Sequence, residues 1–232
     1  MGTPFLAIDG FIMSFSLSDL TFLPDLPTLA TYTLAAFVLA ITPGPDMALF
    51  LARTVVNGKK AGFAAMFGAS TGLLGHALLA GLGLSALLAA SATAFMIVKI
   101  IGALYLVFLA YQALRHGSGL TADYQPAAEQ SFFRVWLTGL GINLTNPKVV
   151  MFFVTFLPQF VDPSDPYASD KILFLGLFFL VVGIPVCVFI IMTAERFSAF
   201  LRSSPVLIRR FDYSFAAIMS AFAIKLLFTQ GR

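Results

Sequence analysis

Charged residues are scarce in this chain. Only 11% of its 232 residues are Asp, Glu, Lys or Arg, whereas 59% are hydrophobic. Soluble domains carry roughly 25% charged and 45–50% apolar residues. A water-soluble fold of this length has too little interior to bury so much apolar surface. The composition therefore predicts an all-α integral membrane protein, because helices satisfy their own backbone hydrogen bonds in lipid.

Cysteine and histidine are also nearly absent. The one cysteine, Cys187, excludes an internal disulfide and a cysteine-based metal cluster, and it is interpreted as a small buried hydrophobe. The two histidines, His76 and His116, form no HExxH motif. We therefore expect no metal site, no cofactor and no enzymatic activity. The net charge of +3 comes with no basic run interleaved with aromatics, so no nucleic-acid partner is expected either.

The first 26 residues are predicted to be an extension outside the membrane domain. They contain Asp9, Asp19 and Asp25 but no Lys or Arg. A secretory signal peptide opens with positive charge, so this segment does not resemble one. Met13 is an alternative start of the chain.

Apolar runs long enough to span a bilayer, about 20 residues, occur six times. Polar segments rich in Pro, Ser and charge separate some of them at 115–131 and 158–171, and both are expected to be extramembrane loops. The prediction is a single membrane domain over residues 27–232. The six runs are Pro27–Val56, Ala61–Ala90, Thr93–Leu114, Phe132–Leu157, Ile172–Ala194 and Pro205–Phe228.

The distribution of Lys and Arg predicts the orientation of these runs. Nine basic residues fall on one side of the predicted membrane, and two, Lys171 and Arg232, fall on the other. Positive charge is retained on the cytoplasmic side, so both termini are expected outside. The nine are Arg53, Lys59, Lys60, Arg115, Arg134, Arg196, Arg202, Arg209 and Arg210.

Two of the six runs are interrupted at corresponding places. The first breaks at Thr42-Pro43-Gly44-Pro45 and the fourth at Asn143–Pro147, and a shift of 102 residues places Pro45 on Pro147. The same shift places runs one to three (27–114) over runs four to six (132–232), on either side of the loop 115–131. Because each half has an odd number of spans, three, the second half must enter the membrane from the opposite side. This predicts a 3+3 inverted repeat with broken helices one and four. Matched breaks of this kind mark the binding site of secondary transporters.

Proline explains why the helices break there. It lacks an N–H group and clashes with the preceding turn, but it suits the first position of a new helix. Pro45 and Pro147 are expected in that position, with Asn146 as N-cap of the second helix. The freed backbone groups must face protein or a polar cavity. Two coincidental proline kinks are the alternative, but Pro-Gly-Pro followed by Asp46 favours a true break.

These motifs resemble those of a known transporter family. Ile41–Asp46 (ITPGPD), the glycine-rich Gly62–Gly83, Lys99–Tyr105 (KIIGALY), Asn143–Lys148 (NLTNPK) and Phe156–Phe160 (FLPQF) together resemble the LysE/RhtB family of bacterial amino-acid exporters. The resemblance runs from about Leu29 to the last run. It implies a multi-pass protein of the bacterial cytoplasmic (inner) membrane that exports amino acids or their derivatives, driven by protons. The family also has Asn in place of Asp46, which argues against an obligatory proton-carrier role for that residue.

Two charged residues at the breaks are candidates for binding a solute. Asp46 is expected at a helix N-terminus, where it binds the ammonium group of an amino acid, carries a proton, or only caps the helix. Lys148 is its counterpart in the second half. The two could pair until an amino acid inserts between them, but Lys148 could equally extend to the membrane interface.

Polar and small residues complete the candidate site. Asn143, Asn146 and Thr42 lie at the breaks and are expected to contact the solute or the freed backbone groups. His76 shares a helix face with Gly68 and Gly72, so it is either a proton relay or a packing residue. The two glycines are expected to allow close helix packing, and such faces also allow a homodimer.

Other functions remain as alternatives at this point. An exporter of another small solute or of a metal cation would need several converging ligands, and only Asp46 is clearly at membrane depth. An intramembrane hydrolase would need a His-rich metal site, an Asp pair or a Ser–His or Ser–Lys dyad within the bundle, and the sequence shows no such motif. A scaffold subunit would not need two polar helix breaks. The sequence leaves the identity of the solute open.

Overall fold

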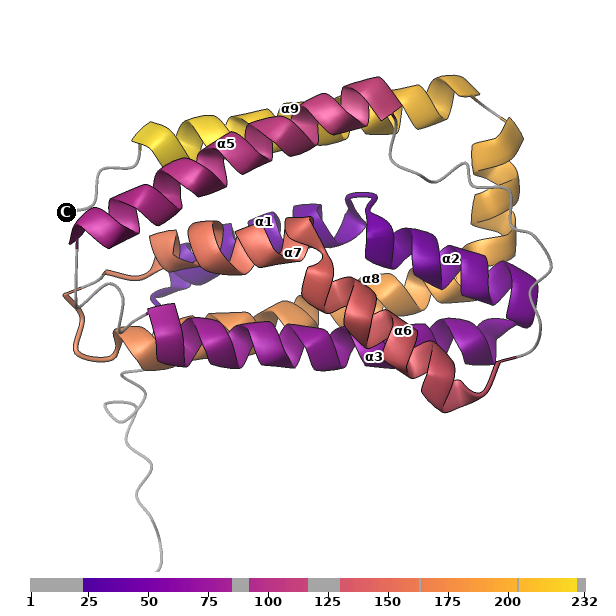
Figure 1. The fold of residues 1–232 in the computed structure, drawn as a ribbon, viewed down its shortest axis with the longest axis horizontal. Coiled ribbons are helices and arrows are strands. Elements are labelled where there is room, and N and C mark those ends of the chain that lie inside the picture. The colour runs from indigo at the N-terminus through magenta and orange to yellow at the C-terminus, as the bar shows by residue number, and fades with distance from the viewer. Residues whose placement is uncertain (1–22, 85–91, 117–129, 163, 204, 229–232) are drawn as a thin grey trace, which may run out of the picture.

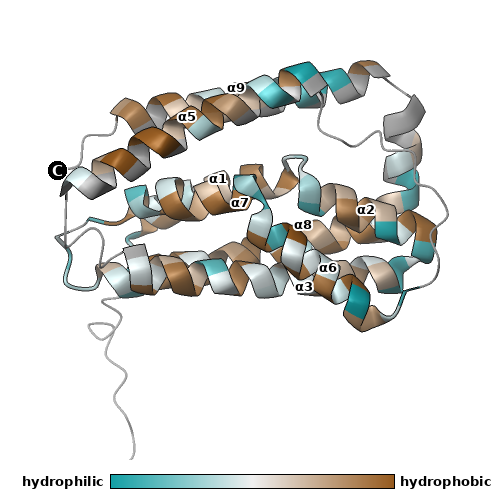
Figure 2. Cartoon of the chain, viewed as in Figure 1, coloured by the Kyte–Doolittle hydropathy of each residue, from teal (hydrophilic) through white to brown (hydrophobic). Residues whose placement is uncertain are grey.

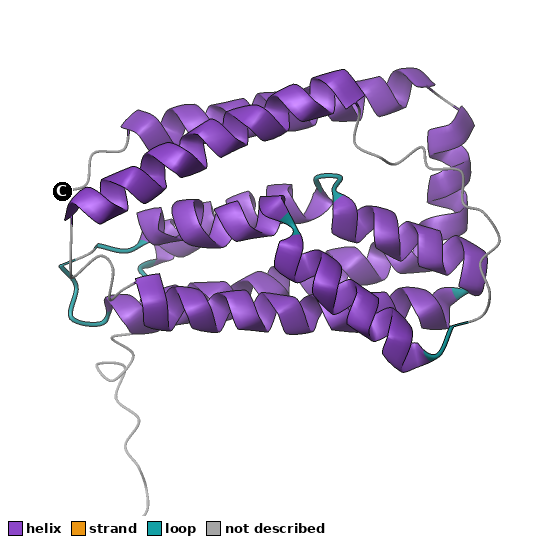
Figure 3. Cartoon of the chain, viewed as in Figure 1, coloured by secondary structure: helices purple, strands orange, loops and turns teal. Residues whose placement is uncertain are grey.

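The computed structural model describes residues 23–84, 92–116, 130–162, 164–203 and 205–228. The described residues form helices joined by short turns, with no strand among them (Figure 3). Short π-helical segments, Ala80–Leu84 and Phe152–Phe156, and a 3-10 turn, Leu157–Phe160, extend two of the helices. The α-helices are α1 (Leu26–Ile41), α2 (Pro45–Asn57), α3 (Lys59–Leu79), α5 (Ala92–His116), α6 (Phe132–Thr145), α7 (Pro147–Met151), α8 (Ala168–Ser203) and α9 (Pro205–Phe228).

The all-helical prediction is confirmed for the described residues. Two continuous segments, Lys59–Gly83 and Ala168–Arg196, are long and apolar enough to cross a membrane, and the number rises to four if each bent helix pair is one span. Helices α5 and α9 match the third and sixth predicted runs closely. The count of six spans and the 3+3 repeat stay predictions.

The two predicted breaks are present and have nearly the same geometry. Helices α1 and α2 meet at an angle of 50°, and α6 and the Pro147–Phe160 segment meet at 48°. Pro45 and Pro147 each occupy the first turn of the helix that follows the break, as predicted. The second break is narrower than predicted. Helix α6 continues to Thr145, because the N–H of Asn146 still donates to the carbonyl of Asn143.

Two glycines bring helix α3 into close contact with α6. Helix α3 lies against α2, α6 and α8, while α5 lies along α9 at one side of the molecule (Figure 1). A Cβ at Gly68 of α3 would lie 1.9 Å from the carbonyl oxygen of Trp136, and one at Gly139 of α6 would lie 2.2 Å from that of Ala65. The two helices therefore touch backbone to backbone, which only glycine permits.

Large apolar side chains cover the outside of the bundle. Leu34, Phe67 and Phe189 are 64%, 51% and 67% exposed, and hydrophobic residues extend along the long helices (Figure 2). An apolar surface on this scale would be unfavourable in water and suits contact with lipid chains.

Helix α8 is longer than predicted at both ends. It begins at Ala168 rather than Ile172 and runs past Ala194 to Ser203. Asp165 organises the start, since it accepts hydrogen bonds from the N–H of Tyr167 and the ammonium of Lys171. The expected loop 158–171 is shorter accordingly. Most of the expected loop 115–131, the end of the second run, and the first 22 residues with Met13 lie outside the described residues.

Candidate functional site

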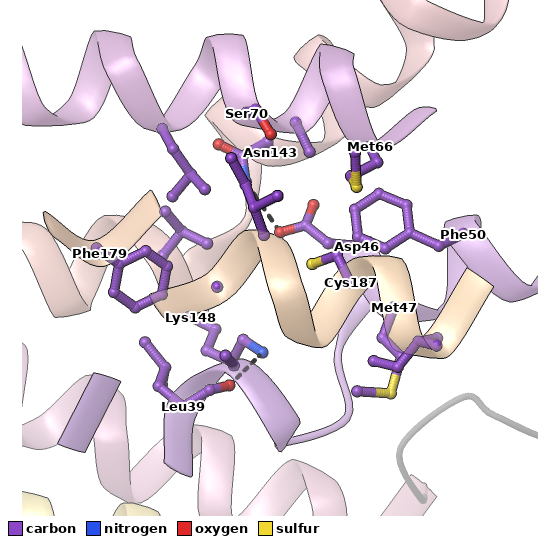
Figure 4. A pocket seen from close by; sticks show the side chains of 17 residues that line it. Leu39, Asp46, Met47, Phe50, Met66, Ser70, Asn143, Lys148, Phe179 and Cys187 are labelled. Carbon is purple, nitrogen blue, oxygen red and sulfur yellow. Dashed lines mark hydrogen bonds between the residues drawn. The ribbon is translucent and has the colours of Figure 1, made fainter. Parts of the chain in front are cut away.

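The two helix breaks meet at the carboxylate of Asp46. Asp46 lies in the first turn of α2. Its Oδ2 accepts hydrogen bonds from the side-chain amides of Asn143 and Asn146, each at 2.9 Å. Both amides belong to the other broken helix, so this carboxylate joins the two halves of the chain. Figure 4 shows the contact with Asn143.

Lys148 makes the reciprocal contact with the first broken helix. Its side chain is only 9% exposed. The ammonium donates to the carbonyl oxygens of Leu39 at 3.2 Å and Thr42 at 2.8 Å, where α1 ends. A cation is favourable there because the last carbonyls of a helix have no partner in the helix and carry its negative dipole end.

The sequence left open whether Asp46 and Lys148 pair, and no ion pair within 4.0 Å joins them in the described part of the chain. Lys148 binds the freed carbonyls of α1 instead, and Asp46 binds amides. A Cβ at Gly44 would lie 3.2 Å from the Lys148 nitrogen, so the glycine in the first break leaves room for this arrangement.

The two asparagines play different structural roles. Asn146 is the N-cap of α7, as predicted, because its Oδ1 accepts from the N–H of Lys148 at 3.0 Å. Asn143 was expected inside the break, but it lies in the last turn of α6 and is 1% exposed. Its amide nitrogen donates to Asp46 from within the helix, so Asn143 contributes its side chain to the site and not freed backbone groups.

Two buried acceptors at this point have no hydrogen-bond donor among the described residues. They are Oδ1 of Asp46 and Oδ1 of Asn143. A buried acceptor without a donor costs about 1–3 kcal/mol, so such atoms mark a place where a further donor would bind favourably. An ammonium group, with three donors and a positive charge, fits an ionised carboxylate and an amide oxygen.

A cavity lies beside these groups. It provides about 60 Å³ to the centres of water-sized molecules, which is several times what one water needs. Asp46, Asn143, Lys148 and Ser70 supply its polar groups, and apolar side chains form the rest (Figure 4). The apolar lining is Leu39, Ala40, Met47, Phe50, Met66, Ala69, Leu73, Val149, Phe179, Gly183, Ile184, Cys187 and Ile190.

Thr42 and His76 lie near the cavity but are not among the described residues that line it. The Thr42 hydroxyl donates to the carbonyl of Val38, and its own carbonyl accepts from Lys148. His76 Nε2 lies 3.3 Å from the carbonyl oxygen of Asn143, and its ring packs on Phe153. His76 thus contacts the backbone of a site residue, and Asn143 lies between it and Asp46.

The glycines predicted to pack helices do so, and Gly72 also shapes the site. Gly68, Gly72 and His76 are all buried on α3, as their shared face predicts. A Cβ at Gly72 would lie 2.5 Å from Oδ1 of Asn143. The absence of a side chain at Gly72 therefore lets the Asn143 amide reach Asp46. Both glycines pack within the chain, and the homodimer stays a prediction.

Sequence reasoning missed the contribution of α8. Phe179, Gly183, Ile184, Cys187 and Ile190 line the cavity from this helix. The signal available was Pro185, inside an apolar run and next to Gly183-Ile184. A proline at that place removes a backbone hydrogen bond, as the prolines at the two breaks do. Cys187 is half-buried beside the site rather than enclosed in a core.

Comparison with known proteins gives one family and several relatives. The model of the LysE type translocator family matches residues 37–230. A homoserine/homoserine lactone efflux protein of Salmonella typhimurium is 32% identical over 171 residues, 74% of this chain and 82% of the relative. Uncharacterised membrane proteins of Vibrio cholerae and Pseudomonas aeruginosa are 36% and 30% identical, over 69% and 84% of this chain and 74% and 93% of theirs. No solved structure gives a significant match.

Proposed function

Because the chain belongs to the LysE type translocator family, we propose that it exports small amino acids or their derivatives across a bacterial cytoplasmic membrane. The solute binds between the two helix breaks, and the proton gradient drives its export. The observation that carries the proposal is the Asp46 carboxylate, held by two amides with one oxygen left without a donor.

A 3+3 inverted repeat accounts for how the helices contact each other. In such a repeat, the first broken helix (α1 and α2) corresponds to the second (α6 and α7), α3 corresponds to α8, and α5 to α9. Helices α1 and α2 pack on α8, and α6 packs on α3, which is the same contact with the halves exchanged. Helices α5 and α9 contact each other, and exchanging the two halves leaves this contact unchanged. This pattern supports the repeat, and in transporters built from such a repeat the solute binds near the pseudo-twofold axis.

Asp46 binds the ammonium group of the solute. The amides of Asn143 and Asn146 occupy one carboxylate oxygen and keep the charge oriented, while the other oxygen, Oδ1 of Asp46, accepts from the ammonium. A charge-assisted hydrogen bond in this setting is about twice as strong as a neutral one. Recognition by ammonium suits both an amino acid and its lactone, the two solutes in the name of the Salmonella relative.

Lys148 binds the carboxylate of an amino acid. Its ammonium has three donors, of which two reach the carbonyls of Leu39 and Thr42. The side chain lines the cavity, so the third donor is available to the solute. A lactone has no free carboxylate and does not use this contact.

Proton coupling is assigned to the same cluster. Asp46 takes up the proton after the ammonium has left. His76 contacts the backbone carbonyl of Asn143, which cannot pass a proton on, so a relay by His76 would need a water molecule between its ring and the Asp46 carboxylate. A carboxylate at membrane depth that exchanges an ammonium for a proton couples the two movements directly.

Efflux from loaded proteoliposomes tests the proposal. We expect export of homoserine and of homoserine lactone that accelerates with an imposed proton gradient. Asp46→Ala, which removes the acceptor oxygens altogether, should abolish export of both solutes, whereas Lys148→Met should reduce homoserine export far more than lactone export. The proposed function would be refuted if proteoliposomes with the wild-type protein released no loaded amino acid or lactone faster than protein-free liposomes do. Equal loss of both solutes in Lys148→Met would refute the assigned role of Lys148.

A further inference from the structure

A second cavity lies near the C-terminal end of α2, against the part of α8 that follows the lining of the central cavity, and is not part of the site above. It has a volume of about 300 Å³ in the same measure. Its lining is Thr54, Lys59, Ile191, Met192, Thr193, Glu195 and Arg196. The central cavity is mainly apolar, whereas this cavity has charged groups of both signs at its edge.

The two cavities follow one another along the same pair of helices. On α2, Phe50 lines the central cavity and Thr54 lines the second, and the Thr54 hydroxyl donates to the Phe50 carbonyl at 2.6 Å. On α8, Cys187 lines the central cavity and Ile191, four residues further on, lines the second. One helical turn advances about 5–6 Å, so the cavities are separated by about the thickness of one layer of side chains.

That layer is apolar and well packed. Phe50, Met66 and Ile191 are 3%, 3% and 0% exposed and belong to one hydrophobic cluster. Phe50 and Met66 face the central cavity, and Ile191 faces the second. Because these side chains separate the two cavities, a solute that passes from one cavity to the other must displace side chains of this layer.

The charges at the second cavity match a zwitterion. Lys59 and Arg196 supply donors for a carboxylate, and Glu195 supplies an acceptor for an ammonium. None of the three has an ion-pair partner within the described part of the chain. Lys59 and Arg196 also belong to the nine basic residues that predict the cytoplasmic side.

We propose that this second cavity is a cytoplasmic vestibule, which captures zwitterionic amino acids before they pass the Phe50–Met66–Ile191 layer into the central cavity. The proposal rests on the proposed function for the direction and the class of solute. The electrostatic capture raises the local concentration of the solute at the entrance, and the apolar layer keeps the central charges out of contact with cytoplasmic water.

The single cysteine of the chain allows a test that does not depend on transport. Cys187 lines the central cavity, so its labelling by a membrane-impermeant methanethiosulfonate reports access to that cavity. In membrane vesicles of defined orientation, we expect faster labelling from the cytoplasmic face than from the external face. Thr193→Trp fills the vestibule and should slow cytoplasmic labelling about tenfold or more. Thr138→Trp, on α6 and outside both cavities, is the matched control and should label like the wild type.

The kinetics of export test the capture of the solute. Glu195→Gln should raise the KM for a cytoplasmic amino acid about two- to fivefold, as expected for one exposed charge, and leave kcat unchanged. Lys60→Gln, beside Lys59 but outside the cavity, should leave both constants unchanged. Labelling that is absent from the cytoplasmic face or insensitive to Thr193→Trp would overturn the vestibule, as would an unchanged KM in Glu195→Gln. Failure of the proposed function would appear differently, as wild-type vesicles that export no amino acid.

Discussion

Replacing Gly72 by alanine would place a methyl group against the amide that holds Asp46. The added Cβ would lie 2.5 Å from Oδ1, 3.0 Å from Cβ and 3.1 Å from Cγ of Asn143. Real Cβ atoms do not approach other atoms at 2.5 Å, so the Asn143 side chain must move. Its Nδ2 would then lose the 2.9 Å hydrogen bond to the Asp46 carboxylate. The substitution would therefore weaken the support of the Asp46 carboxylate, although neither glycine nor alanine has a polar side chain.

The size of the effect follows from that one hydrogen bond. A hydrogen bond to a charged group contributes about 1.5–3 kcal/mol. At about 1.4 kcal/mol for each factor of ten, the KM for export should rise by about one to two orders of magnitude. The helix itself should remain intact, because alanine is a better helix former than glycine.

The assay is solute efflux from proteoliposomes that contain equal amounts of folded protein. Gly75→Ala on the same helix is the matched control, since a Cβ there would meet only Leu144 Cδ2, at an ordinary 3.8 Å. Asn143→Ala should reproduce the defect of Gly72→Ala, and the double variant should be little worse than either single one. The reasoning would be refuted if Gly72→Ala exported with the KM of Gly75→Ala.

Further predictions concern the same helices and one loop. Gly68→Ala should lower the yield of folded protein in detergent size-exclusion chromatography, because its Cβ would meet the Trp136 carbonyl at 1.9 Å; a normal yield would contradict the backbone contact. Lys148→Met leaves the carbonyls of Leu39 and Thr42 without their donor and should lower the free energy of unfolding by about 1–3 kcal/mol for each, measured by thermal denaturation in detergent; an unchanged midpoint would contradict this. The hydrogen bond from Lys171 holds the pKa of Asp165 below its usual value, so the loop is stabilised above the ordinary pKa near 4 and loses this contribution as the pH falls through the lowered value. Asp165→Asn should remove that acid dependence from the melting temperature, and an identical pH profile would count against the contact.

The helix breaks were predictable because proline acts locally. The missing N–H and the ring clash depend on neighbouring residues alone, so Pro45 and Pro147 indicated where α2 and α7 begin. The N-cap role of Asn146 followed from the same short-range chemistry. The shared buried face of Gly68, Gly72 and His76 followed from helix periodicity.

The contacts across the site were not predictable in the same way. The correspondence of Asp46 and Lys148 suggested that they could pair, but partner choice depends on how the helix ends are offset in space. Lys148 reaches the carbonyls of α1, whose positions the sequence pattern does not give. The cavity wall from α8 was missed for a related reason. An almost uniformly apolar helix has no polar face to indicate its rotation, so Cys187 could not be assigned to the cavity in advance.

The reciprocal contacts at the two breaks also constrain how the halves of the chain can move. Asp46 of the first half binds amides of the second, and Lys148 of the second binds carbonyls of the first. A rotation of one broken helix therefore strains hydrogen bonds on both, which makes the two hinges a single mechanical unit. Damage to one half should then be visible in the other: loss of the Lys148 ammonium should speed amide hydrogen exchange at the end of α1, more than 100 residues away in the sequence.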